Sequence, residues 1–80
     1  MAYENMDAVQ IGSRIRTLRE GQNLSHESLA NGLGVSMSAV AMYETGKRIP
    51  RDEIKIRIAD YFHVPVESIF FPVKQHETCD

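Results

Sequence analysis

The fold of this chain is decided by residues 25–47, which read SHESLANGLGVSMSAVAMYETGK. Ser25 and Ser36 are both good N-cap residues, and each precedes apolar residues at helical spacing. Gly34 lies between the two patterns, where a sharp turn requires a left-handed backbone that glycine adopts at little cost. Gly46 follows the second pattern and ends it. The stretch therefore predicts two short helices joined by a sharp glycine turn.

The apolar residues of this stretch fall on the inner faces of the two expected helices. Ala30 is small enough for the helices to cross closely, and Val40 fills the angle between them. The inner residues are Leu29, Ala30, Leu33, Val40 and Tyr43. The second helix is expected from Met37 to about Thr45, and its other side is left free.

The chain before this stretch contains one more helix. Ile11, Ile15 and Leu18 share one face of an amphipathic helix of about three turns, which Gly21 and Asn23 close. Residues 1–10 show no clear period and are expected to form an N-terminal arm.

The chain after this stretch predicts two further helices. Lys47 to Pro50 form a basic loop, and a helix with a broad apolar stripe follows, from about Asp52 to Phe62. His63 stands where a helix end usually has glycine or asparagine. A last short helix spans residues 65–70, with Val66, Ile69 and Phe70 turned inward. We expect an all-α, five-helix domain over residues 11–71 and a polar tail over residues 72–80.

Composition limits the class of protein. A chain of 80 residues, 42% hydrophobic and 25% charged, fits one globular domain and has no apolar run that spans a membrane. The single cysteine, Cys79, allows no intramolecular disulfide, and no signal-peptide pattern is visible, so we expect a cytoplasmic protein. His26, His63 and His76 show no metal-ligand spacing. We expect no metal, no cofactor and no small-molecule substrate.

Net charge at first argues against a nucleic-acid partner. The whole chain has a net charge of −2. Between Ile11 and Arg57, however, eight Lys and Arg stand against five Asp and Glu, a local balance of +3. The negative net charge of the whole chain comes from its two ends and from the region of the last two helices. It therefore does not exclude DNA as a partner.

Residues 25–47 closely resemble the helix-turn-helix of the phage-repressor, Cro-like (Xre) family of transcription regulators. The resemblance covers about Ile11 to Phe70 and implies a compact lambda-repressor-like domain. The residues that match the family pattern are Ile11-Gly12, Arg14 to Arg16, Leu18-Arg19, Leu24-Ser25, Leu29-Ala30, Leu33 to Ser36, Tyr43-Glu44, Gly46 to Arg48, Pro50, Val64 and Ile69-Phe70.

The resemblance implies roles for individual residues. The base-facing positions in the major groove are Met37, Ser38, Ala41 and Met42, and the phosphate-contacting positions are His26, Ser36, Lys47 and Arg48. Arg19 and Glu44 match a structural ion pair of the family. Simpler interpretations stay open. Met37 and Met42 could be core residues, Ser36 could act only as an N-cap, and Lys47 and Arg48 could be solvated charges.

The base-facing residues depart from the family's common pattern. None of them makes a bidentate contact to guanine or adenine, whereas methionine and alanine pack on thymine methyls. We therefore expect a T/A-rich, pseudo-palindromic operator read with modest specificity, and a homodimer that binds it. Phe70, Phe71 and Val73 are the candidates for the dimer contact. The alternative is that Phe70 fills the core and Phe71 is a tolerated exposed aromatic.

The leading interpretation is a sequence-specific double-stranded DNA-binding regulator, a repressor, that is not an enzyme. No paired carboxylates or set of nucleophile and base is visible. The rival interpretation keeps the fold as a protein-interaction module, such as a small antitoxin or a partner of a larger regulator. The apolar reading face and the acidic total keep that rival open.

Overall fold

The computed structural model describes residues 7–71, and within them it contains five helices and no strand. The helices are α1 (Ala8–Gly21), α2 (His26–Leu33), α3 (Met37–Thr45), α4 (Asp52–Phe62) and α5 (Val66–Phe70). The predicted all-α class and the order of the helices are confirmed. Residues 1–6 and 72–80, which include most of the expected arm and tail, lie outside the described residues.

The first helix begins earlier than the sequence suggested. Its expected start was near Ile11, but α1 starts at Ala8 because the Asp7 carboxylate accepts a hydrogen bond from the Gln10 amide at 2.9 Å. An aspartate at this position satisfies one of the free N–H groups of the first turn. Residues 8–10 therefore belong to α1 and not to the expected arm.

The two helices of the quoted stretch begin and end as predicted. Ser25 accepts a hydrogen bond from the Ser28 amide, and Ser36 accepts one from the Ala39 amide, each at 3.0 Å. Gly34 ends α2 with a φ of 74°, and Gly46 ends α3 with a φ of 82°. Both glycines occupy the left-handed region, where a side chain is disfavoured.

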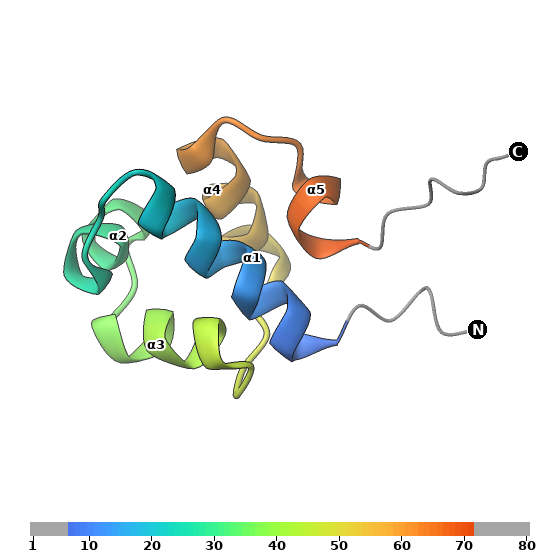
Figure 1. Cartoon of the computed structure of the whole chain (residues 1–80), viewed down its shortest axis with the longest axis horizontal. Helices are drawn as coiled ribbons and strands as arrows, with labels where there is room; N and C mark the ends of the chain where they lie inside the picture. Colours follow the sequence, from blue (N-terminus) through green and yellow to red (C-terminus); the bar gives the residue numbers. More distant parts are fainter. Residues whose placement is uncertain (1–6, 72–80) are drawn as a thin grey trace, which may run out of the picture.

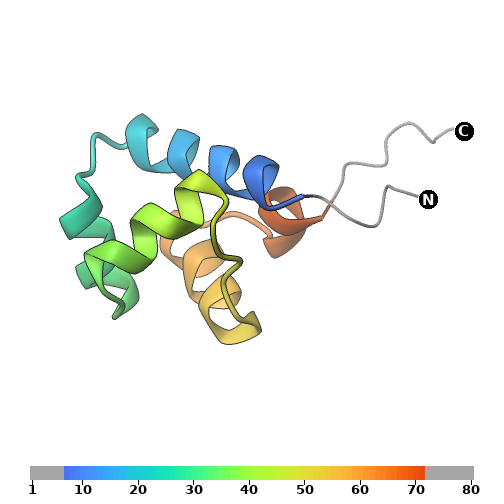
Figure 2. The ribbon, with the colours of Figure 1, turned by 90° about the horizontal axis from the view of Figure 1, so that it is seen from below.

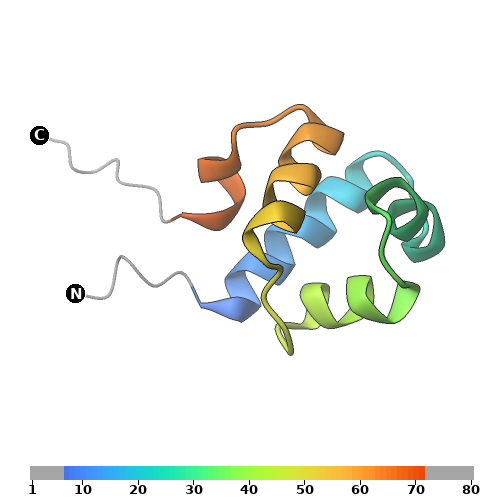
Figure 3. The same ribbon diagram turned by 180° about the vertical axis from the view of Figure 1, so that it is seen from behind.

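The helices pack so that α3 lies at one edge of the molecule. It contacts α1 and α2, while α4 packs against α2 and α5 (Figure 1). The view from below shows α3 nearest the reader, with α1 above it and α4 below it (Figure 2). From behind, the short turn that joins α2 to α3 is visible (Figure 3). One side of α3 is thus packed and the other faces outward.

Close contact between α1 and α3 depends on a glycine. A Cβ added at Gly12 would lie 2.4 Å from the carbonyl oxygen of Tyr43 and 2.5 Å from that of Glu44. No side chain fits there unless the backbones separate. Gly12 therefore allows the backbones of α1 and α3 to come into direct contact. The buried core consists of Ile11, Ile15, Leu29, Ala30, Leu33, Ala39, Val40, Tyr43, Ile54, Ile58, Ala59, Phe62, Ile69 and Phe70.

At the end of the domain the structure contradicts the dimer role expected for Phe70 and agrees with the alternative, in which Phe70 fills the core and Phe71 is exposed. Phe70 is 4% exposed and belongs to the core, so it has almost no surface to offer a second subunit. The amphipathic pattern of α5 turns Ile69 and Phe70 inward together. Phe71 lies after the helix and is 49% exposed. Val73, the third residue expected at a dimer contact, lies outside the described residues.

Candidate nucleic-acid interface

The outward side of α3 carries the predicted base-facing residues. Met37 is 54% exposed, and Ser38 and Ala41 are also exposed. Met42 is only partly buried. Val40 is fully buried on the opposite side. The helix is therefore anchored by its inner side and presents a row of small and sulfur-containing side chains to an outside partner.

Ser36 stands at the start of this helix as its N-cap. Its hydroxyl oxygen already accepts the Ala39 amide at 3.0 Å. The hydroxyl proton is free to bond elsewhere, because a serine hydroxyl both donates and accepts. Ser36 thus has a structural role that the structure shows, and a phosphate contact by the same group stays a prediction.

Arg19 of α1 and Glu44 of α3 form a nearly buried ion pair. Arg19 Nε donates to Glu44 Oε2 at 2.6 Å and Nη2 donates to Oε1 at 3.2 Å. The side chain of Glu44 is 4% exposed. Hydrogen bonding to Glu44 raises the pKa of Arg19 above its ordinary value, while burial acts in the opposite direction. A third bond, from Arg19 Nη1 to the Leu24 carbonyl at 2.7 Å, ties the α1–α2 loop to the same pair.

His26, at the start of α2, joins this ion pair. Its Nε2 lies 3.1 Å from Oε1 of Glu44. Glu44 therefore binds side chains from α1 and α2 and holds the two helices against α3. Sequence reasoning assigned His26 to a phosphate and missed this contact, because residues 26 and 44 meet only through the fold.

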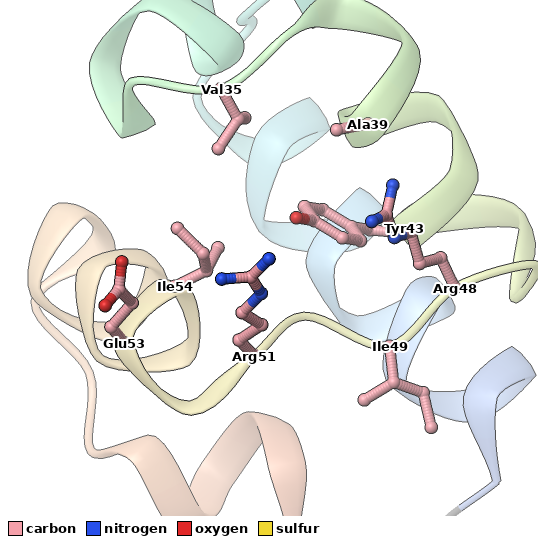
Figure 4. Close-up of a pocket in the computed structure, with 8 residues that line it drawn as sticks. All are labelled: Val35, Ala39, Tyr43, Arg48, Ile49, Arg51, Glu53 and Ile54. Atoms are coloured by element: carbon pink, nitrogen blue, oxygen red, sulfur yellow. The ribbon is translucent and has the colours of Figure 1, made fainter.

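The loop after α3 carries the predicted basic residues and one more. Lys47 and Arg48 are exposed, and so is Arg51 at the start of α4. Arg48 and Arg51 line a pocket of about 220 Å³ between α3 and α4 (Figure 4). Ile49, between the two arginines, lines the same pocket. The loop therefore presents a basic edge beside the outward side of α3.

Four other basic residues bond or pack within the domain itself. Arg14 donates to the Ser68 carbonyl at 2.8 Å, and Arg57 donates to the Leu33 carbonyl at 3.0 Å. Lys55 lies over the Phe70 ring at 5.6 Å from its centroid. Arg19 is held in its ion pair. About half of the local positive charge thus also makes contacts within the fold.

The described residues 7–71 contain no group of three His, Cys, Asp or Glu side chains that could hold a metal ion. None of the helices in this part of the chain has the length and hydropathy of a membrane span.

Comparison with known proteins identifies the family. The model of the helix-turn-helix family matches residues 15–69. The chain belongs to this family. The match spans α1 to α5 and therefore includes the candidate interface of this helix-turn-helix protein.

One curated relative is the cryptic phage CTXphi transcriptional repressor RstR of Vibrio cholerae. It is 35% identical over 57 residues, which cover 71% of this helix-turn-helix protein and 51% of RstR. The chain thus spans about half of the length of that repressor.

Two solved structures extend the comparison. The restriction-modification controller protein C.AhdI of Aeromonas hydrophila has a TM-score of 0.74 and 30% identity, and the match covers 79% of this chain and 96% of that one. The biofilm regulator SinR, solved in complex with DNA, has a TM-score of 0.69 and 25% identity over 74% of this chain and 95% of that one.

Proposed function

We propose that this helix-turn-helix protein is a sequence-specific, double-stranded DNA-binding transcriptional regulator, and that α3 enters the major groove. The observation that carries the proposal is the exposed row of Met37, Ser38 and Ala41 on a helix whose opposite side is buried. A partner that covers this row also meets the basic loop at Lys47 and Arg48. The family match and the DNA complex of SinR support the same assignment.

The proposed activity is binding without catalysis, in the cytoplasm. Met37, Ala41 and Met42 offer apolar contacts to thymine methyls, and Ser38 offers one hydrogen bond. The proposed operator is therefore T/A-rich and read with modest specificity. The domain acts as a repressor when its operator overlaps a promoter, a role for which the name of the relative RstR is the support.

We also propose that the chain binds its operator as a homodimer, because one domain reads one half-site and paired half-sites lie about 34 Å apart. Phe71, exposed after α5, stays a candidate for the contact, as does Val73, which lies outside the described residues. Sedimentation at micromolar concentration tests this: Phe71→Ser should shift a dimer toward the monomer. A wild-type chain that stays monomeric both free and on DNA would contradict the proposal.

Selection from a pool of random duplexes, followed by titration of the recovered sequence, tests the DNA-binding function. Ala41→Glu places a charge on the outward side of α3 and should weaken binding about a hundredfold, because like charges then face each other. Asn31→Glu adds the same charge on an exposed position of α2 and is the matched control. Equal losses in the two variants would mean that α3 is not the reading helix.

Salt dependence separates DNA binding from the rival protein-interaction function. The logarithm of the affinity falls linearly with the logarithm of the salt concentration, and each phosphate contact adds about 0.9 to the magnitude of this negative slope. Lys47→Ala and Arg48→Ala should each reduce the magnitude of that slope by about 1. Each should also weaken binding to all duplex sequences by about the same factor. If the wild-type chain binds no duplex even at low salt, the exposed apolar row serves a protein partner instead.

A further inference from the structure

The hydrogen bond between His26 and Glu44 fixes the location of the proton on the neutral imidazole. Arg19 donates to both carboxylate oxygens of Glu44, at 2.6 and 3.2 Å. A carboxylate held in this way accepts hydrogen bonds and donates none. The contact of 3.1 Å between His26 Nε2 and Glu44 Oε1 therefore requires a proton on Nε2. Neutral imidazole has only one N–H group, so Nδ1 of neutral His26 has no proton.

This assignment changes what His26 offers to DNA. Within the described part of the chain, the bond to Glu44 is the one hydrogen bond of the ring, and the side chain is 43% exposed. The nitrogen left for an outside partner, Nδ1, is an acceptor in the neutral ring and cannot donate to a phosphate oxygen. Protonation adds an N–H group at Nδ1. Only the imidazolium can donate to Glu44 and to a phosphate at the same time.

We propose that DNA binding by this chain is coupled to protonation of His26, so that its affinity for the DNA backbone rises as the pH falls below neutral. The inference rests on the proposed DNA-binding function and describes a control of the same interface. Histidine is the side chain whose charge ordinarily changes between about pH 5 and pH 8, so this is the range in which the coupling is tested.

The charges around the ring fit this coupling. The ring lies at a pocket that Arg16, Arg19 and Glu44 also line. Glu20 of α1 pairs with Arg16 at 3.0 Å, and Glu27 lies on the same helix as His26. Charged groups of both signs therefore lie near the ring.

A phosphate at the ring adds a second anion beside Glu44, and an imidazolium donates to that anion where the neutral ring does not. By linkage, a proton then raises the affinity for DNA by the same factor by which DNA raises the affinity for the proton.

Titration of the selected duplex at about pH 6 and about pH 8, at constant ionic strength, tests the coupling. A mixed-sequence duplex at low salt serves as the probe if selection recovers no operator. At the lower pH, the wild-type affinity for the duplex should be about three- to tenfold higher per bound subunit. This is near the lower end of the range for a charged hydrogen bond, because the ring is half exposed. His26→Gln should show no such change, because its amide donates at either pH.

Two further histidines provide matched controls. His63 ends α4, and His76 lies outside the described residues. His63→Asn and His76→Gln should both keep the wild-type pH dependence. Thermal melts at both pH values verify that every variant is folded.

Equal pH dependence in the wild type and in His26→Gln overturns the inference while leaving the proposed function intact. Loss of the pH dependence in either control variant also overturns it. Nitrogen-15 NMR of the free chain at high pH tests the premise directly, since a proton found on Nδ1 of His26 would contradict it. If no variant binds any duplex at either pH, the proposed DNA-binding function itself fails, and the inference fails with it.

Discussion

Helices α2 and α3 are joined in the same way as α4 and α5, although the residues differ. In each pair the first helix ends on a left-handed residue, Gly34 with a φ of 74° or His63 with a φ of 58°. A half-buried valine follows, Val35 or Val64, and its amide donates to a carbonyl in the last turn of the preceding helix at 3.0 Å. The turn between α2 and α3 and the turn between α4 and α5 thus have the same form.

Each pair is also tied to α1 by one arginine of that helix. Arg19 binds Glu44 in the first pair, whereas Arg14 donates to the Ser68 carbonyl in the second. The first contact joins two opposite charges in a nearly buried setting. The second joins a charge to an exposed backbone oxygen. The first pair is therefore fixed more firmly against α1 than the second.

The difference between the pairs bears on which helix carries the proposed function. Both turns have the geometry of a helix-turn-helix, but α5 is short and turns Ile69 and Phe70 into the core. Helix α3 is longer and leaves Met37 and Ser38 exposed. The turn alone does not make a reading helix, because the role also depends on the length of the second helix and on the side chains it exposes.

The largest expected effect comes from removing the ion pair between Arg19 of α1 and Glu44 of α3. Glu44→Ala leaves the Arg19 guanidinium nearly buried without its carboxylate, which should cost about 3–5 kcal/mol of the free energy of unfolding. Arg14→Ala in the second pair removes a bond to an exposed carbonyl and should cost about 1 kcal/mol. Urea denaturation of the two variants and the wild type measures both values. Equal losses would mean that the two ties are equivalent.

The next effect concerns the left-handed residue of the first turn. Gly34→Ala should cost about 1–2 kcal/mol, since a side chain is disfavoured at its positive φ. The added Cβ would meet only Arg57 Nη1, at an ordinary contact distance of 3.4 Å, so the backbone conformation is the main cause. His63→Ala at the equivalent position already starts from a side chain and should change stability little. A Gly34→Ala variant as stable as the wild type would contradict this explanation.

Sequence patterns predicted the helices and turns because the deciding residues act locally. Ser25, Ser36, Gly34 and Gly46 act on backbone groups within a few positions of themselves, and the sequence shows them directly. The early start of α1 was missed because the capping role of Asp7 precedes any apolar period.

Contacts between distant parts of the chain were harder to predict. The pair of Arg19 and Glu44 was expected only through the family resemblance. The bond from His26 to Glu44 was missed because each residue was assigned one role. Burial of Phe70 agrees with the helical pattern that turns it inward, and it contradicts only the assignment of Phe70 to a dimer contact. Arg14 and Arg57 were counted as local charge, and their bonds to backbone carbonyls appear only in the structure.

A smaller effect distinguishes the N-caps of the second helices. Ser36→Ala removes the side-chain bond to the Ala39 amide and should cost about 1 kcal/mol. Pro65, the equivalent residue before α5, makes no side-chain cap bond. Pro65→Ala therefore should lose only the restriction of the unfolded chain, about 0.4–1 kcal/mol. Amide hydrogen exchange should show the difference locally, with faster exchange at the start of α3 in Ser36→Ala. An unchanged exchange rate there would show that the cap bond does not stabilise the helix.

The smallest expected effect is a gain in stability in the second turn. His63→Gly places glycine where the backbone φ is 58°, so the strain of a side chain in the left-handed region is relieved. Glycine also loses more backbone freedom on folding, which offsets part of this gain and leaves about 0.5 kcal/mol. Urea denaturation at a pH where histidine is neutral measures the gain without a contribution from its charge. The reverse exchange, Gly34→His, should lose more than His63→Gly gains, because a side chain there lies against Arg57, whose bond to the Leu33 carbonyl closes the first turn. If the two exchanges were equal and opposite, the turns would differ only in the conformational preference of one residue.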